Sequence, residues 1–466
     1  MSAGRPEIAV VGGGIAGLAA ALRLRERLPD ARVTVFEQGD RLGGKLWTGS
    51  LAGAAVEFGA ESFLVQDPGG AGESAAVTLA RRVGLGADLV HPEPVPPGLV
   101  LDGQLLPLPP GTLLGVPGDL DRVAAVATPA AGRDRDDGRP LLRPGADVAV
   151  GELVRRRLGD QVVDRLVDPM LGGVYAGRAD ALSLVATMPG LAAACATEST
   201  LTGAVRAALA AAPRPAGAPV FATVRGGLGR LAGAVAAASG AAVVLGRPVR
   251  DLAPAGAGWR LVVGSSRDAE TVRADAVVLA VPARVAARLL RGAAGAAAEP
   301  VGVLDYASVA LVTLALPPVD LPAWSGFLVP AGEGTTIKAA TFSSRKWAHA
   351  GGGDGAVLLR ASVGRYGEEH VLQIADADLI AVVHAELTKV VGHLPVPVAG
   401  HVQRWGGALP QYAPGHPARV AAARAALPPT LRLAGAGYDG VGIPACVRSG
   451  ETAAEEIAAE LGGLSP

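Results

Sequence analysis

The spacing of apolar residues changes twice near the start of the chain. Residues 8–11 are continuously apolar, which is typical of a strand buried in a sheet. Residues 15–28 have apolar side chains at helical spacing, and residues 32–37 (RVTVFE) return to a β-type pattern. A strand, a helix and a second strand within about thirty residues form a βαβ unit, whose two strands run parallel. We therefore predict a parallel sheet that begins at the N-terminus.

Beyond this unit the pattern predicts a helical middle section and then a return to strands. The expected elements are loops with short strands over 90–118, an exposed charged loop over 132–144, helices over 151–171 and 188–212, strands over 242–252, 259–263 and 276–281, alternating strands and turns over 300–410, a strand over 431–434 and a final helix over 446–461. An α/β protein with a helical middle section is therefore expected.

Composition narrows the classes of protein to consider. The chain has 466 residues, and 50% of them are hydrophobic, as expected of a globular protein with a large core. Lys and Arg number 42 and Asp and Glu number 43, which leaves a net charge of −1. A near-neutral chain offers no electrostatic basis for binding nucleic acid, so we expect no such partner.

Cysteine content and hydropathy bear on location. Cys195 and Cys446 are too few and too far apart for a disulfide framework or a zinc site, so we expect no metal and a reducing, cytoplasmic location. No apolar run reaches the ~18–20 residues that a membrane-spanning helix needs. The run over 301–316 comes nearest, but it contains Asp305. We expect at most peripheral membrane contact.

Glycines between the first strand and the first helix carry the strongest chemical signal. The motif is Gly12-x-Gly14-x-x-Gly17, and Glu37 follows it at the end of the second strand. The first glycine permits a tight turn, the second lets the backbone approach a pyrophosphate, and the third lets helix and strand pack closely. The helix N-terminus supplies N–H groups for phosphates, and the acid can accept hydrogen bonds from a ribose diol. This combination predicts a dinucleotide site and disfavours NADP.

Three further patches favour a flavin dinucleotide. Arg41-Leu42-Gly43-Gly44 stands just after the acid, where a nicotinamide enzyme needs no such element. The small residues of segment 57–62 (EFGAES) can let backbone approach an isoalloxazine ring, and the glycine-rich segment 435–444 opens the last helix with an anion-binding geometry. Taken alone, each patch is also compatible with an ordinary surface or hairpin turn. Together with the first motif, they predict bound FAD.

Several strings resemble the protoporphyrinogen/coproporphyrinogen oxidase family of amine-oxidase-like flavoproteins, in the soluble form found in Gram-positive bacteria. The strings are VVGGGIAGLAAALRLRE, EQGDRLGGKLWTG and FGAESFL in the N-terminal region, LPLPPGTLLGVPGDL (106–120) and DPMLGGVYAGRADALSL (168–184) in the middle, and KAATFSSRKWAH (338–349), RWGGALPQYAPGH (404–416) and AGYDGVGIPACVRSG (436–450) towards the C-terminus. The resemblance spans almost the whole chain, and several strings are specific to this family.

The resemblance implies an α/β fold with a Rossmann-type FAD-binding domain, a substrate domain with a mixed sheet and a helical substrate-binding subdomain. The FAD-binding domain is expected in three parts, 1–85, 216–285 and 411–466. The helical subdomain is expected over 86–215 and the mixed-sheet domain over 286–410.

The resemblance also assigns FAD contacts by position. They are Gly12, Gly13, Gly14, Ile15, Ala16 and Gly17 in the first turn, Glu37 and Gln38 at the ribose, Arg41, Gly43, Gly44 and Lys45 near the pyrophosphate, Gly59, Ala60, Glu61 and Ser62 along the flavin, Val249 at the adenine, and Trp405, Val441, Gly442, Ile443 and Pro444 closing the flavin site.

The activity implied is oxidation of coproporphyrinogen III by O₂ in haem biosynthesis, with release of hydrogen peroxide in three two-electron steps and possible handover of the product to a ferrochelatase. The substrate carries four propionates, so basic groups are expected around it. The substrate-binding candidates are Gly173, Tyr175, Arg178, Arg345 and Lys346. Each arginine is equally compatible with a solvated surface position, and Phe342 and Trp347 fit either a macrocycle contact or the core.

Other readings stay open. No catalytic side chain stands out, and a backbone carbonyl within 172–175 is only a loose candidate for a base. Alternative functions are a protoporphyrinogen IX oxidase, a carotenoid desaturase with a broad apolar surface, a catalytically idle FAD or porphyrin carrier, and a flavin amine oxidase. An amine oxidase needs an aromatic cage, but only 3% of the residues are aromatic and the C-terminal turn offers Tyr438 alone.

Overall fold

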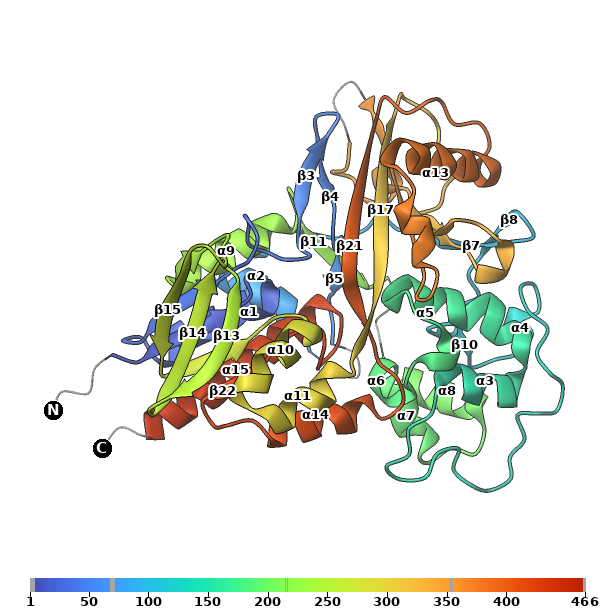
Figure 1. The fold of residues 1–466 in the computed structure, drawn as a ribbon. Helices are drawn as coiled ribbons and strands as arrows, with labels where there is room; N and C mark the ends of the chain where they lie inside the picture. Colours follow the sequence, from blue (N-terminus) through green and yellow to red (C-terminus); the bar gives the residue numbers. More distant parts are fainter. Residues whose placement is uncertain (1–4, 68–71, 214, 216, 352–354, 464–466) are drawn as a thin grey trace.

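A parallel sheet of five strands lies in the half of the molecule that holds both termini (Figure 1). The computed structural model describes residues 5–67, 72–213, 215, 217–351 and 355–463. The sheet has the order β12-β2-β1-β16-β22, with every neighbouring pair parallel. Its strands are β1 (Glu7–Val11), β2 (Arg32–Phe36), β12 (Ala242–Val244), β16 (Ala276–Leu279) and β22 (Leu431–Leu433). Helix α1 (Ile15–Arg27) joins β1 to β2, which confirms the predicted βαβ unit.

Around this sheet the chain forms hairpins, further sheets and helices. In chain order these are β3 (Thr48–Leu51), β4 (Ala54–Glu57), β5 (Phe63–Leu64), α2 (Ala75–Arg82), β6 (Leu89–Val90), β7 (Pro97–Leu101), β8 (Gln104–Pro107), β9 (Thr112–Leu113), β10 (Val116–Pro117), α3 (Val150–Leu158), α4 (Asp160–Val162), α5 (Asp168–Tyr175), α6 (Leu184–Thr187), α7 (Pro189–Cys195), α8 (Leu201–Ala211), β11 (Phe221–Val224), α9 (Gly229–Ser239), β13 (Val249–Ala255), β14 (Gly258–Gly264), β15 (Ala269–Ala274), α10 (Ala283–Ala293), α11 (Gly295–Gly302), β17 (Asp305–Leu316), β18 (Gly326–Leu328), β19 (Ile337–Thr341), α12 (Ser343–Lys346), β20 (Val357–Val363), α13 (Asp376–Val391), β21 (Ala399–Gln411), α14 (His416–Ala425) and α15 (Ile443–Gly463).

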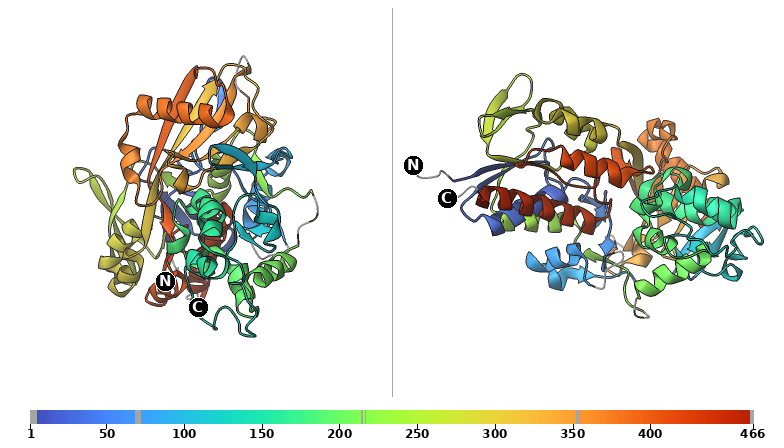
Figure 2. Two further views of the ribbon diagram at one scale, coloured as in Figure 1. Left: turned by 90° about the vertical axis from the view of Figure 1, so that its right-hand side faces the viewer. Right: turned by 90° about the horizontal axis from the view of Figure 1, so that it is seen from below.

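Both faces of the parallel sheet are buried, which explains the continuous apolar run of β1. Successive residues of a strand point to opposite faces. Ile8 and Val10 therefore pack in one cluster with α1, α9 and α15, whereas Ala9 and Val11 pack in another with the β13-β14-β15 sheet and α10. Seen from below, the red C-terminal helices lie across the sheet, and the teal helices of the middle section lie at the opposite end of the molecule (Figure 2).

The helical middle section is more broken than its sequence pattern predicts. The helix expected over 151–171 is interrupted at Gly159, whose φ of +92° requires a residue without a side chain. A π-helical turn over Val163–Val167 then leads into α5. The helix expected over 188–212 is two helices, α7 and α8, separated by residues 196–200. The section keeps its own apolar core, to which Leu153, Leu166 and Leu201 contribute.

A seven-stranded mixed sheet stands between the parallel sheet and the middle section. Its order is β21-β17-β20-β19-β18-β7-β8, and β17 and β21 are its longest strands (Figure 1). Helix α13 packs on this sheet, although only strands and turns were expected over 300–410. The sequence does hold the helical signal, because Leu379, Val383 and Leu387 recur every four residues and are fully buried.

Two further expectations need adjustment. The strand expected over 242–252 divides into β12 and β13, which join different sheets, because the chain turns at Gly246 with a φ of +67°. Strands β7 and β8 come from the segment assigned to the helical subdomain but form one edge of the seven-stranded sheet. The domain boundaries stay a prediction, and residues 214 and 216 beside the boundary at 215/216 lie outside the described part. None of the described helices combines the length and apolarity needed to cross a membrane.

The close contact between α1 and α15 generates a stability prediction. A Cβ added at Gly450 would lie 2.0 Å from the Ala16 carbonyl oxygen, so Gly450→Ala must push the two helices apart. We expect it to lower the free energy of unfolding by about 1–3 kcal/mol or more, as measured by denaturant titration.

Gly233→Ala is the matched control. It lies within α9, where an added Cβ meets no atom within 4 Å, so it is expected to leave stability unchanged or to raise it by about 0.5–1 kcal/mol. Equal effects of the two substitutions would contradict the packing argument.

Candidate functional site

The first glycine turn is shaped by contacts within the protein at two of its three glycines. An added Cβ would lie 2.3 Å from the Ala280 carbonyl oxygen at Gly12 and 2.0 Å from the Gly12 carbonyl oxygen at Gly17. Gly12 also has a φ of +109°. These two positions are therefore glycine because strand β1, helix α1 and the residue after β16 approach one another so closely.

Gly14 differs, because nothing in the protein lies within 4 Å of the Cβ that it lacks. Helix α1 begins directly after it, with no side-chain cap and no acidic residue in its first turn. The first N–H groups of a helix have no partner within the helix, and they carry the positive end of its dipole. The turn thus leaves an open space bordered by unpaired N–H groups, which is the geometry of an anion site.

Glu37 lies beside this opening. Its carboxylate accepts hydrogen bonds from the N–H groups of Gly13 and Gly39, each at 2.8 Å. Its own carbonyl accepts from the Arg247 N–H at 3.0 Å, which brings the start of β13 alongside. Val249 is buried there in the same apolar cluster as Phe36, whereas Gln38 is exposed.

The Arg41–Lys45 segment is attached directly to the first turn. The Gly43 N–H donates to the Gly13 carbonyl at 2.8 Å, and Gly43 and Gly44 have φ values of +98° and +57°. The Arg41 guanidinium donates to the Gly44 carbonyl at 2.8 Å and lies 4.3 Å from the centre of the Trp47 ring. The hydrogen bond from Gly43 to Gly13 therefore joins the Arg41–Lys45 segment to the first glycine turn, although the two are separate in the sequence.

Lys45 connects this corner to the seven-stranded sheet. Its ammonium donates to the Ala408 carbonyl at 2.7 Å, and its carbonyl accepts from the Ala60 N–H at 2.9 Å. Burial lowers the pKa of the Lys45 ammonium, although part of the residue stays exposed to solvent. Segment 59–62 passes close by, because an added Cβ at Gly59 would lie 1.9 Å from the Lys45 carbonyl oxygen.

The remaining cofactor candidates lie on β21 and in the C-terminal turn. The Trp405 indole N–H donates to the Phe58 carbonyl at 2.7 Å, and its ring meets Trp47 edge to face at 6.1 Å.

In the C-terminal turn, Asp439 accepts two hydrogen bonds from Arg424, at 2.9 and 2.6 Å. Helix α15 begins after this turn at Ile443, earlier than expected, so Pro444 belongs to its first turn. Tyr438 is buried in an apolar cluster and does not line an aromatic cage of the kind an amine oxidase needs.

The five substrate candidates occupy different surroundings. Gly173 is exposed on α5, but Tyr175 packs against Tyr412 within the helical core, where burial raises its pKa to about 12. Arg178 lies 3.3 Å from the Asp168 carboxylate, and the exposed Arg345 donates to the Leu321 carbonyl at 2.7 Å.

Lys346 forms a 2.6 Å ion pair with Glu61. Burial alone would raise the pKa of Glu61, but the charges of Lys346 and Arg360 outweigh it and lower that pKa. The Lys346 charge is therefore already compensated. Phe342 and Trp347 are both buried, and Phe342 packs against Phe327 in the sheet core.

Lys338 was missed by the sequence analysis. It is 4% exposed on β19, and its ammonium donates to the Gly172 carbonyl of α5 at 3.3 Å. Burial, together with the nearby Arg365, lowers the pKa of Lys338 to about 7. A lysine within the otherwise apolar strand IKAAT was the available signal, because such a residue is rarely buried without a local reason.

Comparison with known proteins places this site in a family. Residues 15–458 match the family model described as flavin containing amine oxidoreductase. The chain belongs to this family. It is an FAD-dependent oxidoreductase, and the open cradle at Gly14 with its unpaired N–H groups fits the pyrophosphate of that cofactor.

Relatives extend over nearly the full chain. Coproporphyrinogen III oxidase of Mycobacterium tuberculosis (strain H37Rv) is 42% identical over 94% of each chain, and that of Bacillus subtilis is 30% identical over 98% of each. The structure of a candidate protoporphyrinogen oxidase from Exiguobacterium sp. 255-15 covers 98% of this chain and 99% of its own at a TM-score of 0.83 and 31% identity. Cyclohexylamine oxidase from Brevibacterium oxydans shares the fold, at a TM-score of 0.71 and 19% identity over 98% of this chain and 100% of its own.

The open space at Gly14 generates a cofactor prediction. Gly14→Val places a side chain where the structure has no protein atom, so we expect the protein to fold normally but to retain less than a tenth of its FAD. Far-UV circular dichroism measures the fold, and absorbance near 450 nm measures bound flavin. A yellow variant with one FAD per chain would contradict this location of the pyrophosphate.

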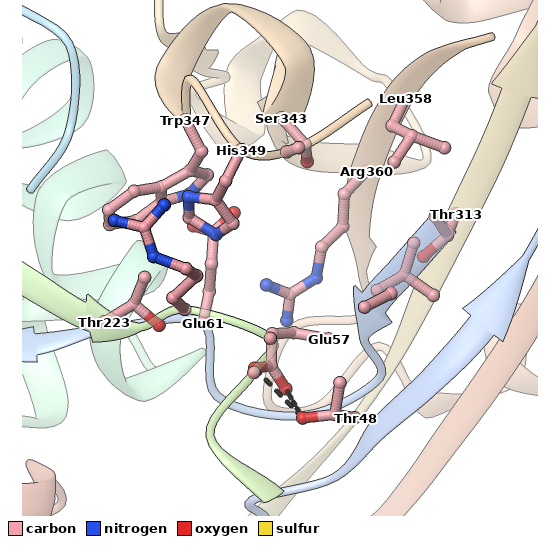
Figure 3. Close-up of a pocket in the computed structure, with 16 residues that line it drawn as sticks. Thr48, Glu57, Glu61, Thr223, Thr313, Ser343, Trp347, His349, Leu358 and Arg360 are labelled. Atoms are coloured by element: carbon pink, nitrogen blue, oxygen red, sulfur yellow. Dashed lines mark hydrogen bonds between the residues drawn. The ribbon is translucent and has the colours of Figure 1, made fainter. Parts of the chain in front are cut away.

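Glu57 generates a prediction about pH. Its carboxylate accepts from the Leu228 N–H at 2.5 Å and from Thr48 at 3.0 Å, and burial raises its pKa to about 7 (Figure 3). A raised pKa means that the folded state binds the proton more tightly than the unfolded state. This contribution to stability is therefore complete below about pH 4.5 and is lost as the pH rises through 7.

Replacing Glu57 with Gln removes the titration. The variant should lose less stability than the parent between pH 4.5 and 7, by at most about 3 kcal/mol. Denaturant titrations at several pH values test this, and parallel stability curves for the two proteins would contradict the assignment.

Proposed function

We propose that this protein oxidises coproporphyrinogen III to coproporphyrin III in haem biosynthesis, with O₂ as the acceptor. The reaction removes six hydrogens in three two-electron steps and converts three O₂ to three hydrogen peroxide. The observation that carries the proposal is the 42% identity, over 94% of both chains, to a coproporphyrinogen III oxidase. The open cradle at Gly14 supports it, since it suits the pyrophosphate of FAD.

The chain's first task is to hold the cofactor. We assign the pyrophosphate to the N–H groups of residues 14–17, since the Gly13 N–H already donates to Glu37. The ribose is assigned to Glu37 and Gln38, and the adenine surroundings to Val249. Arg41, Gly43, Gly44 and Lys45 complete the phosphate corner. Bound FAD supplies a two-electron acceptor that O₂ can reoxidise.

The second task is to shape the flavin end. Segment 59–62 and Trp405 form one wall in this proposal, and residues 441–444 form the other. The N-terminus of α15 and the Lys45 ammonium bring positive charge to this end, where it can stabilise negative charge that develops during the reaction. Gly59 packs closely against the Lys45 carbonyl and the Trp405 ring in this wall, and Trp405 is held by its hydrogen bond to Phe58.

The third task is to position a substrate with four carboxylates. Gly173 and the neighbouring Val174, which is 41% exposed, offer a small surface on α5 for the macrocycle. Arg345 is a better candidate for a propionate than Lys346 or Arg178, because Glu61 and Asp168 already pair with those two side chains. Tyr175 is the last residue of α5, and in this proposal its buried side chain anchors that helix in the core of the helical section. No side chain is assigned as the base.

We further propose that the protein works in the cytoplasm and passes its product to a ferrochelatase. The two cysteines, both unpaired and buried, suit a reducing compartment. We also propose the five-segment domain division predicted from the sequence, except that β7 and β8 belong with the mixed-sheet domain.

The decisive assay uses purified protein and two substrates. Coproporphyrinogen III should bleach the flavin band without oxygen and yield fluorescent porphyrin with oxygen, and its kcat/KM should exceed that of protoporphyrinogen IX at least tenfold. Gly14→Val is the control for spontaneous autoxidation. A preference for protoporphyrinogen IX would refute the substrate assignment, and no flavin bleaching by either compound would refute the activity.

A further inference from the structure

A cavity of about 150 Å³ lies behind segment 59–62. It is lined by the β3–β4 hairpin, the turn after β11, the region of α12, and strands β17 and β20 (Figure 3). Of segment 59–62 only Glu61 lines it, and none of residues 172–178 or 435–444 does. The cavity is therefore separate from the surface of α5 proposed for the macrocycle, although Ser343 and Trp347 place it beside Arg345.

Two arginines face this cavity, and neither forms an ion pair with a carboxylate of the described residues. Among the described residues, the Arg360 guanidinium has no carboxylate within 4 Å, and the Arg225 side chain has neither a hydrogen bond nor an ion pair. Arg360 does donate to the Gly59 carbonyl, but its Nε is buried and unpaired. Guanidinium groups left in this way are suited to a carboxylate or phosphate, which they can bind through two parallel hydrogen bonds.

Thr313 provides a second, independent observation. It pairs with Arg360 across strands β17 and β20, and only 2% of it is exposed. Within the described part of the chain, its hydroxyl has no hydrogen-bond partner although it lines the cavity. A buried hydroxyl without a hydrogen-bond partner lowers the stability of the folded protein by about 1–3 kcal/mol. We therefore expect it to have a partner inside the cavity.

The acidic residues of the cavity are already engaged. Glu61 is paired with Lys346 at 2.6 Å, and Glu57 is held by Thr48 and by the Leu228 N–H at the start of α9. Burial also raises the pKa of Glu57 to about 7, which reduces its negative charge near neutral pH. The charge left uncompensated in the cavity is therefore positive.

We propose that this cavity binds a small oxyanion, a carboxylate or phosphate group, through Arg225, Arg360 and Thr313. The volume is sufficient for such an ion with accompanying water. Since Arg360 also donates to Gly59, the bound ion lies against the back of the segment that faces the flavin. The site is an additional one for a small ligand and does not depend on which porphyrinogen is oxidised.

The test is anion-dependent thermal stability of the FAD-loaded protein at constant ionic strength. Phosphate or acetate should raise the Tm by about 2–4 °C over chloride at saturation. A response to phosphate alone or to acetate alone identifies which oxyanion is preferred, and either supports the site. Equal Tm values in all three salts would overturn it and leave only water in the cavity.

Two variants locate the effect. Thr313→Val keeps the side-chain shape but removes the unpaired hydroxyl, and Arg225→Gln removes an exposed charge, so each should reduce the anion-dependent Tm rise by at least half. Arg122→Gln removes one charge elsewhere on the surface and should leave the rise unchanged. A full rise in both cavity variants would overturn the assignment. Because the readout needs no turnover, failure of the porphyrinogen assay would not affect this test.

Discussion

The uncapped N-terminus of α1 is the feature on which the rest of the structure depends. Gly12 and Gly17 are fixed by contacts with Ala280 and with each other, and these contacts hold strand and helix close together. Gly14 is held in the same turn but has open space in front of it. The protein's own packing therefore creates an unpaired group of N–H donors, and an anionic cofactor provides the partner that the chain does not.

Most of the site is built by attaching distant segments to this turn. Gly43 bonds directly to Gly13, and Lys45 then reaches Ala408 at the end of the seven-stranded sheet. Trp405, three residues before Ala408 on β21, donates its indole N–H to the Phe58 carbonyl and holds segment 59–62 against the same sheet. The N-terminal turn and the seven-stranded sheet are thus joined through hydrogen bonds to a few backbone carbonyls.

The sequence predicted what depends on short-range pattern. The βαβ unit, the glycine spacing and Glu37 all lie within one supersecondary unit, where periodicity and turn chemistry determine the outcome. Contacts such as Lys45 to Ala408 join residues far apart in the chain, and no local pattern encodes them. The division of 242–252 at Gly246 and the break at Gly159 were missed because the apolar pattern resumes beyond each interruption, which was taken to lie within one element. Lys338 and the Arg360–Thr313 pair were missed because their importance comes from burial and cross-strand register, which only the folded chain reveals.

The most direct measurement of the central claim is the flavin content of natively purified protein. Gentle denaturation followed by chromatography should release about one FAD per chain without covalent attachment, and the stripped protein should bind added FAD again. If no flavin is released and added FAD does not bind, the N-terminal turn does not hold this cofactor, and the account built on it is wrong.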